Sequence, residues 1–302
     1  MTAAIVVATD GSPESITAAR WVVDLADRLT ERVTVLDVLQ RPYAEMPVED
    51  VERFQAEARR ALENRLRAAN VHFDECMAVV GDVATLLIDA SQDATMLVLG
   101  SSERTGWGRH GHFSLVHNLA HHVACPIVVI PNDLWTARQP VLVVGIDGSR
   151  GSRLTLEWAT GFAAQAGMRV VAAFVIDDIY TTFGSGQWYG KEEAKARIES
   201  NAASVEMVER FGADPAVSLE AIAAQYDASL LVVGAKEHHS LGGALLGAIP
   251  DELLHHPTCP IAVIPHNMMK SSNPLHDTST APPAVTETRY SHVRADAGGI
   301  TV

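Results

Sequence analysis

The chain has 302 residues, of which 47% are hydrophobic and 20% are charged, a composition typical of a folded protein long enough for two domains. Its formal net charge of −14 excludes the basic surface that nucleic acids and anionic membranes require. The apolar runs are shorter than the ~20 residues that span a bilayer. The N-terminal stretch lacks the basic region of a signal peptide, and three cysteines are too few for a disulfide framework. We therefore expect a cytoplasmic protein that binds neither nucleic acid nor membrane.

The sequence contains an internal repeat, which decides the domain organisation. Three blocks recur in the same order, so that Asp10 corresponds to Asp147 and Gly100 to Gly234. The paired blocks are IVVATDGS (5–12) with LVVGIDGS (142–149), MLVLGSSE (96–103) with LLVVGAKE (230–237), and ACPIVVIP (124–131) with TCPIAVIP (258–265). We expect two copies of one domain over residues 1–135 and 139–266. The remaining segment, 267–302, is rich in Ser, Thr, Pro and Ala without periodicity, which predicts a disordered, flexible tail.

Within the first copy, apolar strand patterns alternate with amphipathic helix patterns. Ser12 and Pro13 supply an N-cap and a first helical position directly after the first strand. The expected strands are 3–9, 33–39, 71–80, 96–100 and 126–130, and the expected helices begin at residue 13 and cover 48–69, 83–91 and 114–122. The second copy follows the same order, with a shorter second helix near 191–201. This alternation predicts an α/β protein with two tandem, doubly wound, five-stranded parallel sheets.

Ligands of such sheets bind beyond the carboxyl ends of the strands, where the strand order reverses. The Asp-Gly-Ser turn after the first strand and the loop after the fourth strand both face that edge in each copy. These motifs, the Gly81-Asp82 and Asp214-Pro215 turns and the final CPI-V-IP strands resemble the universal stress protein family over residues 1–132 and 139–266. The resemblance implies an adenine nucleotide alpha-hydrolase-like fold, a non-enzymatic role in stress or growth arrest, and binding of ATP or another adenine nucleotide.

The resemblance also implies which residues would hold that nucleotide. Asp10 with Val38, and Asp147 with Val175, match the positions that hold the adenine, while a glycine-rich loop after the fourth strand holds the phosphates through backbone N–H groups. The candidate cofactor-binding residues are Thr9, Asp10, Val38, Gly100, Ser101 and Ser114 in the first copy, and Ile146, Asp147, Val175, Gly234, Ala235 and Gly247 in the second. A second interpretation stays open for the two aspartates, since Asp-Gly-Ser is a common turn in which the aspartate caps local N–H groups.

Both phosphate loops depart from the family pattern. Glu103 and Glu237 stand where a glycine is expected, and Phe113 and Ala248 replace a glycine and a hydroxyl residue. Two like charges ~4 Å apart repel by ~4 kcal/mol near a protein surface, so each glutamate opposes a bound phosphate. Two functions are favoured over a slow ATPase or other phosphate-handling enzyme: a regulator whose nucleotide binding is weakened by degenerate loops, and a nucleotide-free protein-interaction scaffold of the same fold.

Several other features point away from catalysis and metal binding. No Ser/His/Asp arrangement, carboxylate pair or P-loop is present, so we expect no enzymatic activity. The pair His117 and His121 has helical spacing but lacks further ligands, which favours solvated or interface histidines over a metal site. Cys125 and Cys259 precede the last strand of each copy and are expected to be buried thiols. Because both last strands are apolar, we expect them to pair within one chain as a pseudo-dimer; a homodimer of whole chains stays open.

Overall fold

A computed structural model of the chain describes residues 4–40, 47–101, 108–132, 138–176, 205–212, 214–235, 248–255, 257–265 and 267–268, without the side chains of Val48 and of residues 108–114. The chain divides into the units Met1–Ser272 and Asn273–Val302. The second unit, and with it the predicted tail from residue 269 onward, lies outside the described residues. So does the helix that we expect near 191–201.

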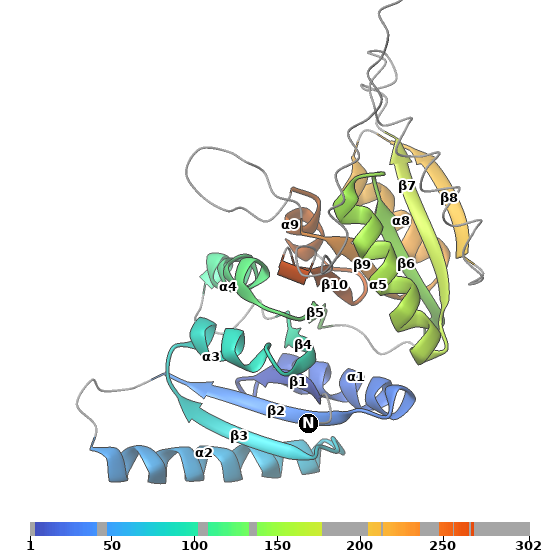
Figure 1. The fold of residues 1–302 in the computed structure, drawn as a ribbon. Coiled ribbons are helices and arrows are strands. Elements are labelled where there is room, and N and C mark those ends of the chain that lie inside the picture. The colour runs from blue at the N-terminus through green and yellow to red at the C-terminus, as the bar shows by residue number, and fades with distance from the viewer. Residues whose placement is uncertain are drawn as a thin grey trace, which may run out of the picture. The chain divides into compact units, whose positions relative to one another are not determined.

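The described part of the first unit alternates strands and helices in the expected order (Figure 1). Its first half contains β1 (Ala4–Thr9), α1 (Pro13–Leu29), β2 (Arg32–Leu39), α2 (Val48–Ala68), β3 (Glu75–Val80), α3 (Val83–Ala90), β4 (Ala94–Gly100), α4 (Gly108–His122) and β5 (Ile127–Ile130). Its second half contains β6 (Gln139–Ile146), α5 (Arg150–Ala166), β7 (Arg169–Ile176), β8 (Val205–Phe211), α8 (Pro215–Gln225), β9 (Ala228–Gly234), α9 (Ala248–His255) and β10 (Ile261–Ile264).

These strands form one ten-stranded sheet in the order β3-β2-β1-β4-β5-β10-β9-β6-β7-β8. Within each half all neighbouring strands are parallel, which confirms two tandem five-stranded, doubly wound units. The halves join where β5 and β10 pair antiparallel, with Val128 opposite Ala262. All residues of β5 and β10 are buried, as expected for strands in the middle of a sheet.

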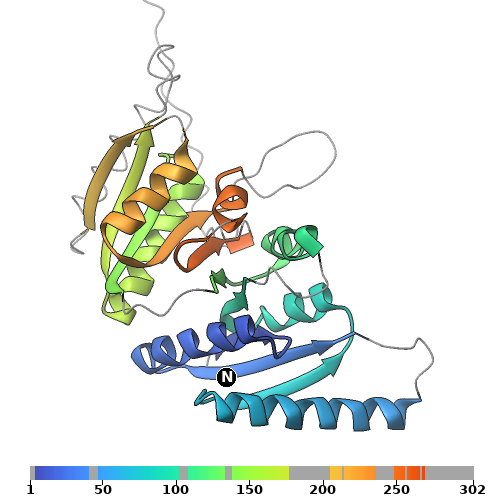
Figure 2. The same cartoon turned by 180° about the vertical axis from the view of Figure 1, so that it is seen from behind.

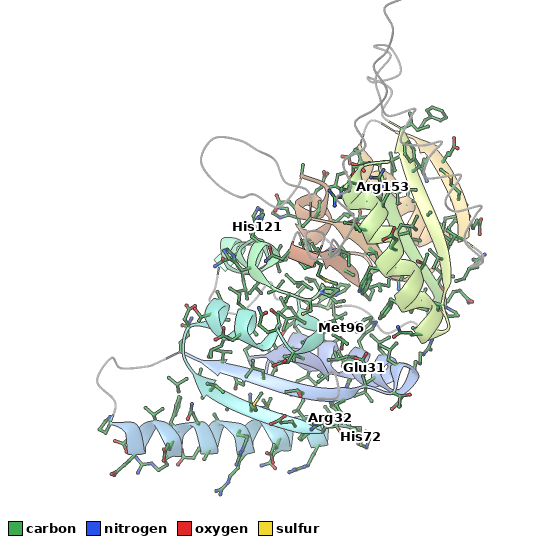
Figure 3. All side chains as sticks on the ribbon, in the orientation of Figure 1. Glu31, Arg32, His72, Met96, His121 and Arg153 are labelled. Atoms are coloured by element: carbon green, nitrogen blue, oxygen red, sulfur yellow. The ribbon has the colours of Figure 1, made fainter. Side chains whose placement is uncertain are left out.

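Helices cover both faces of the sheet. The buried side chains of α1, α2 and α5 belong to one apolar cluster, and those of α3, α4, α8 and α9 belong to another on the opposite face. Figure 2, the view from behind, shows α1 and α2 beside the strands of the first half. Met96 of β4 is 2% exposed and lies inside the first cluster (Figure 3). Burying such a side chain contributes roughly 1.5–3 kcal/mol, so these two layers supply most of the stability.

Local capping fixes where the helices begin. The Ser12 side chain accepts a hydrogen bond from Ser15 N and caps α1. The Ser149 side chain accepts one from Ser152 N and caps α5. Asp82 and Asp214 do the same for α3 and α8, through Thr85 N at 2.9 Å and Val217 N at 3.1 Å. The Gly-Asp and Asp-Pro turns of the sequence are therefore helix N-caps.

The expected start of the third strand was wrong. We expected a strand from residue 71, whereas β3 begins at Glu75. The segment instead ends α2: Asn70 has φ +55°, Asn70 N donates to Arg67 O, and Val71 N donates to Leu66 O. This is a Schellman motif, in which Val71 is the apolar residue that packs back on the helix.

The start of α4 also differs from the expectation. The glycine and histidine content of residues 108–113 favours a loop, yet α4 begins at Gly108. Val116, Leu119 and Ala120 are buried on one face of this helix, and that packing outweighs the low propensity of its first turn. Among the described helices, none has both the length and the apolar character that crossing a bilayer requires.

Candidate functional site

The strand order places most of the candidate residues at one edge of each half. β1 pairs with β2 on one side and with β4 on the other, so the strand order reverses beside β1. The carboxyl ends of these parallel strands meet at the same edge, which brings Asp10, Val38 and Gly100 together. In the second half β6 lies between β7 and β9, which does the same for Asp147, Val175 and Gly234.

The first Asp-Gly-Ser turn is held by its own hydrogen bonds. Ser12 N donates to Asp10 Oδ1 at 2.9 Å, and Gly11 N donates to Thr9 Oγ1 at 3.0 Å. Gly11 has φ +73°, a left-handed conformation that favours glycine. Although partial burial acts to raise it, the hydrogen bonds from Ser12 and Ser15 hold the pKa of the Asp10 carboxyl below its ordinary value. Asp10 is therefore an anchored, ionised carboxylate at neutral pH.

The second turn repeats this geometry. Ser149 N donates to Asp147 Oδ1 at 2.9 Å, and Gly148 has φ +78°. Both aspartates thus perform the capping role of the turn interpretation. An ionised carboxylate accepts about four hydrogen bonds, so this role leaves capacity for a ligand donor.

The end of β4 lies against the first turn of α1. A Cβ added to Gly100 would be 2.8 Å from Glu14 O and 3.0 Å from Ser15 N, so no side chain fits there. The next amide is already used, since Ser101 N donates to Ile130 O at 2.8 Å. The equivalent amide of Ala235 donates to Ile264 O at 2.9 Å. Those two N–H groups already donate hydrogen bonds within the sheet. A phosphate would have to bind to other N–H groups of the loops.

The remaining phosphate-loop candidates are only partly placed. Ser114 lies in the second turn of α4 instead of at its first residue, because the helix begins at Gly108; its side chain is outside the described residues. Gly247, Glu103 and Glu237 also lie outside the described residues. Ala248 is the first residue of α9 and is exposed.

Asp37 is a charged residue at this edge that the sequence reasoning missed. It stands opposite Thr9 in the β1–β2 ladder, one residue before Val38, and is half-buried. Burial raises the pKa of the Asp37 carboxyl to about 6, and the negative charge of Asp10 acts in the same direction. A carboxylate within an otherwise apolar strand was the signal in the sequence that could have identified it.

Arg65, from the last turns of α2, lies against the same turn. Its Nη1 donates to Gly11 O at 3.4 Å, and a Cβ on Gly11 would be only 2.4 Å from that nitrogen. The Arg65 charge acts to lower the pKa of Asp37. One guanidinium thus lies against the Asp10–Gly11–Ser12 turn and acts on the charge of Asp37.

The second half is apolar at the corresponding positions. Phe174 stands opposite Ile146 in the β6–β7 ladder, as Asp37 stands opposite Thr9. Phe174 is 2% exposed and Ile146 is 6% exposed. The two halves therefore share the aspartate turn but differ in the residues beside it.

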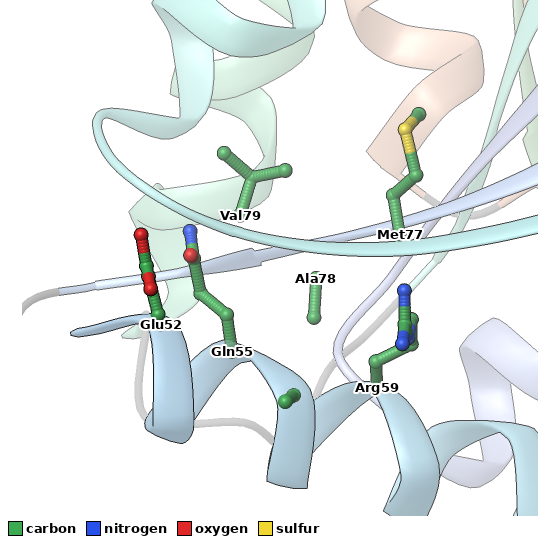
Figure 4. Close-up of a pocket in the computed structure, with 7 residues that line it drawn as sticks. Glu52, Gln55, Arg59, Met77, Ala78 and Val79 are labelled. Atoms are coloured by element: carbon green, nitrogen blue, oxygen red, sulfur yellow. The ribbon is translucent and has the colours of Figure 1, made fainter. Parts of the chain in front are cut away.

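A groove of about 330 Å³ lies between α2 and the outer strand β3, where Ala78 and Val79 pair with Asp37 and Val38 of β2 (Figure 4). Glu52, Gln55 and Arg59 extend into it from α2. Its other lining residues are Ala56, Met77, Ala78 and Val79. None of the candidate cofactor-binding residues lines this groove, although Val79 pairs with Val38.

The helical pair His117 and His121, and the cysteines Cys125 and Cys259, lie in packed parts of the fold. His117 Nδ1 of α4 lies 3.5 Å from Asp251 Oδ1 of α9, an interface position, and His121 lies one turn further along α4 (Figure 3). Within the described residues no three His, Cys, Asp or Glu side chains gather as a metal site. Burial raises the pKa of both Cys125 and Cys259 to about 12, so these thiols are protonated and poorly reactive at neutral pH.

Comparisons with known proteins agree with this architecture. A model of the universal stress protein family matches residues 1–131 and again residues 140–265. A universal stress protein of Mycobacterium tuberculosis (strain ATCC 25618 / H37Rv) is 26% identical over 282 residues, 86% of this chain and 96% of the relative. One from Mycolicibacterium smegmatis is 28% identical over 285 residues, again 86% of this chain and 96% of the relative.

Solved structures share the fold at low sequence identity. A universal stress protein from Archaeoglobus fulgidus has a TM-score of 0.66 and 16% identity, and the match covers 86% of this chain and 97% of that one. A putative universal stress protein from Pseudomonas aeruginosa has a TM-score of 0.59 and 14% identity, with 89% and 96% coverage. With the family model matching both halves, the chain belongs to the universal stress protein family, as a tandem of two family domains.

Proposed function

We propose that this chain is a non-enzymatic regulator of stress or growth arrest that binds an adenine nucleotide, ATP or AMP, at the carboxyl edge of its sheet. One observation carries the proposal: both halves place the same hydrogen-bonded Asp-Gly-Ser turn at the point where the strand order reverses. Membership of the family supports the same interpretation, with Asp10 and Asp147 as the groups that hold the adenine.

The chemistry of the edge suits an adenine better than a phosphate. Each anchored carboxylate can accept a hydrogen bond from the exocyclic amino group of adenine. In the second half, the half-buried Val175 lies beside the turn and Phe174 leaves the register position of Asp37 uncharged, which suits an uncharged aromatic base. We therefore favour the second half as the stronger site.

Two features weigh toward the alternative function, a nucleotide-free scaffold for protein partners. The N–H groups of Ser101 and Ala235 are already bonded within the sheet, and Glu103 and Glu237 add negative charge to the loops. Each reduces the attraction for phosphate. The two functions differ in one measurable property, which is whether the protein binds nucleotide at all.

Equilibrium dialysis with radiolabelled ATP and AMP tests the proposal on the full chain. We expect Asp10→Ala and Asp147→Ala each to weaken binding, and the double variant to abolish it. Asp74→Ala is the matched control, because Asp74 also accepts a backbone hydrogen bond, from Val33 N at 2.8 Å, but lies at the opposite ends of the strands. Unchanged binding in the double variant, or loss of binding in the control, would reject this assignment.

We also propose that the antiparallel β5–β10 pair makes each chain an intramolecular pseudo-dimer. The pairing of Val128 with Ala262 inside one continuous sheet supports this. We propose the cytoplasm as the place of action, since all three cysteines are buried free thiols and suit a reducing compartment.

A further inference from the structure

We infer that Asp37 is a specificity-determining residue of the first half: its carboxylate makes that site discriminate against anionic ligands, so the first site takes up ATP well only when this group is neutral. The inference rests on the proposed nucleotide function, and it makes the two halves of the chain unequal. It names a residue whose equivalent in the second half has no charge.

The position of Asp37 follows from the register of the sheet. In the β1–β2 ladder Asp37 is opposite Thr9, the last residue of β1, and directly precedes Val38. Val33 and Val35 of the same strand belong to the apolar cluster beneath α1 and α2, whereas Leu36 belongs to the cluster on the other face. Because side chains alternate along a strand, Asp37 faces α1 and α2. It is thus placed beside the Asp10 turn, at the edge where the nucleotide would bind.

The groups around Asp37 leave an excess of negative charge. Asp10 contributes a second carboxylate from the end of β1, and Arg65 contributes one positive charge from α2. On β3, the neighbouring strand, Cys76 is the nearest titratable group, and its thiol is neutral because burial raises its pKa to about 11. Arg59 and Glu63 of α2 also face β3, but they lie 3.8 Å apart as an ion pair, so their charges offset each other. The buried face of α1 carries no charge and consists of Ser15, Ala18, Ala19, Val22, Leu25 and Ala26.

Arg65 cannot offset both carboxylates. Its guanidinium carries one positive charge and lies against the turn, with Nη1 3.4 Å from Gly11 O, so it neutralises at most one of the two charges. With Asp37 ionised, this edge is net negative, and Coulomb repulsion acts on phosphates at the end of β4, which lies two strands, about 10 Å, from β2. With Asp37 neutral, the remaining charges balance and the same phosphates are tolerated.

The second half lacks this discrimination. Phe174 occupies the equivalent register position and is buried, and Ile146 replaces Thr9. Asp147 keeps the place of Asp10 in the second turn, and the register position of Asp37 is taken there by the uncharged Phe174. The second site should therefore bind ATP with an affinity that does not depend on a group in β7.

The test compares Asp37→Asn with its parent at the same pH, so that the ionisation of ATP itself cancels. Full-length Asp147→Ala keeps only the first site, and ATP binding is measured by equilibrium dialysis. We expect Asp37→Asn to tighten ATP binding about tenfold at about pH 7.5, where Asp37 is ionised, and less than about twofold at about pH 5, where it is protonated. Asp27→Asn removes the same formal charge from the last turns of α1, at the other end of that helix, and should change neither value.

Adenosine, which has no charge, supplies the matched ligand. Its binding to the first site should change less than about twofold on Asp37→Asn at either pH, since no phosphate is repelled. In full-length Asp10→Ala, which keeps only the second site, Asp37→Asn should leave ATP binding unchanged.

Two results would overturn the inference while leaving the proposed function intact: ATP binding to the first site that Asp37→Asn does not alter at about pH 7.5, or an equal gain for adenosine and ATP. If neither ATP nor adenosine binds any of these variants, the proposed function and the inference fail together. The two failures are therefore distinguishable.

Discussion

At the scale of single residues, the first half contains a carboxyl group, Asp37, whose ionisation destabilises the folded state. Asp37 is a half-buried carboxyl beside Asp10, and burial together with that neighbour raises its pKa to about 6, above the ordinary value of 3.8. A carboxyl whose pKa is raised by folding destabilises the folded state when it is ionised. This cost is fully present above the folded pKa and disappears as the pH falls below the ordinary value.

Asp37→Asn should therefore stabilise the protein in a pH-dependent way. We expect the free energy of unfolding to rise by about 1 kcal/mol at about pH 7.5, a value discounted for the partial exposure of this side chain. The gain should shrink toward zero near about pH 3, below the ordinary pKa of 3.8, where Asp37 is protonated in both states. Urea unfolding followed by circular dichroism at both pH values measures this. An equal gain at both values would show that removing the charge is not the cause.

The internal repeat made part of the candidate site predictable from the sequence. Asp10 and Asp147 follow from matching blocks, and the α/β pattern places them at the carboxyl edge. Asp37 could have been found by aligning the copies, because Phe174 stands at its place in an equally apolar strand. Arg65 could not, because nothing in an arginine-rich amphipathic helix indicates that its guanidinium reaches the turn at Gly11, 54 residues earlier in the chain.

At the scale of elements, the two copies end their first helix differently. Thr30 after α1 has φ +57° and Gly167 after α5 has φ +67°, so both helices end in a left-handed residue. Only glycine adopts this conformation without steric cost, and a β-branched residue there is strained. The first half thus carries strain that the second half avoids.

Thr30→Gly should relieve this strain. We expect the free energy of unfolding to increase by about 0.5–1 kcal/mol, because the steric gain of ~1–2 kcal/mol exceeds the entropic cost of a glycine. Thermal unfolding by calorimetry measures the change. Gly167→Ala is the matched reverse variant: no atom lies within 4 Å of the added Cβ, so any loss of stability comes from the backbone conformation alone. A lower melting temperature for Thr30→Gly would contradict this account.

Element boundaries were less predictable than element order. The apolar residue Val71 reads as part of a strand, but it serves the end of α2, because a Schellman motif also requires an apolar residue after the helix. The start of α4 at Gly108 was missed for the opposite reason, since local propensity is poor and burial of Val116 and Leu119 decides. The first error arises from a local helix-ending motif that resembles a strand, and the second where tertiary packing overrides local propensity.

At the scale of the whole first unit, one sheet of ten strands runs through both family domains. The strands β5 and β10 are short, with four residues each, yet all their side chains are buried. If this pairing holds the halves together as a pseudo-dimer, their association should not require the covalent connection between Asn132 and Arg138.

Cleavage of that connection tests the pseudo-dimer. With a protease site inserted between Asn132 and Arg138, we expect the cleaved halves to elute together from a sizing column at the mass of the intact chain. The buried apolar strands β5 and β10 would otherwise be exposed to water, at a cost of about 25 cal/mol per Å². Light scattering confirms the mass, with uncleaved protein as the control. Halves that elute separately under native conditions would contradict the pseudo-dimer.

The most direct test of the central claim is to identify what the purified protein carries. Full-length protein is denatured, and the released small molecules are identified by mass spectrometry. The account predicts ATP, AMP or another adenine nucleotide at a substoichiometric to equimolar level, lost in the Asp10→Ala, Asp147→Ala double variant and retained in Asp74→Ala. No released nucleotide, together with no change in melting temperature on adding millimolar ATP or AMP, would contradict it and leave the protein-interaction scaffold as the function of this fold.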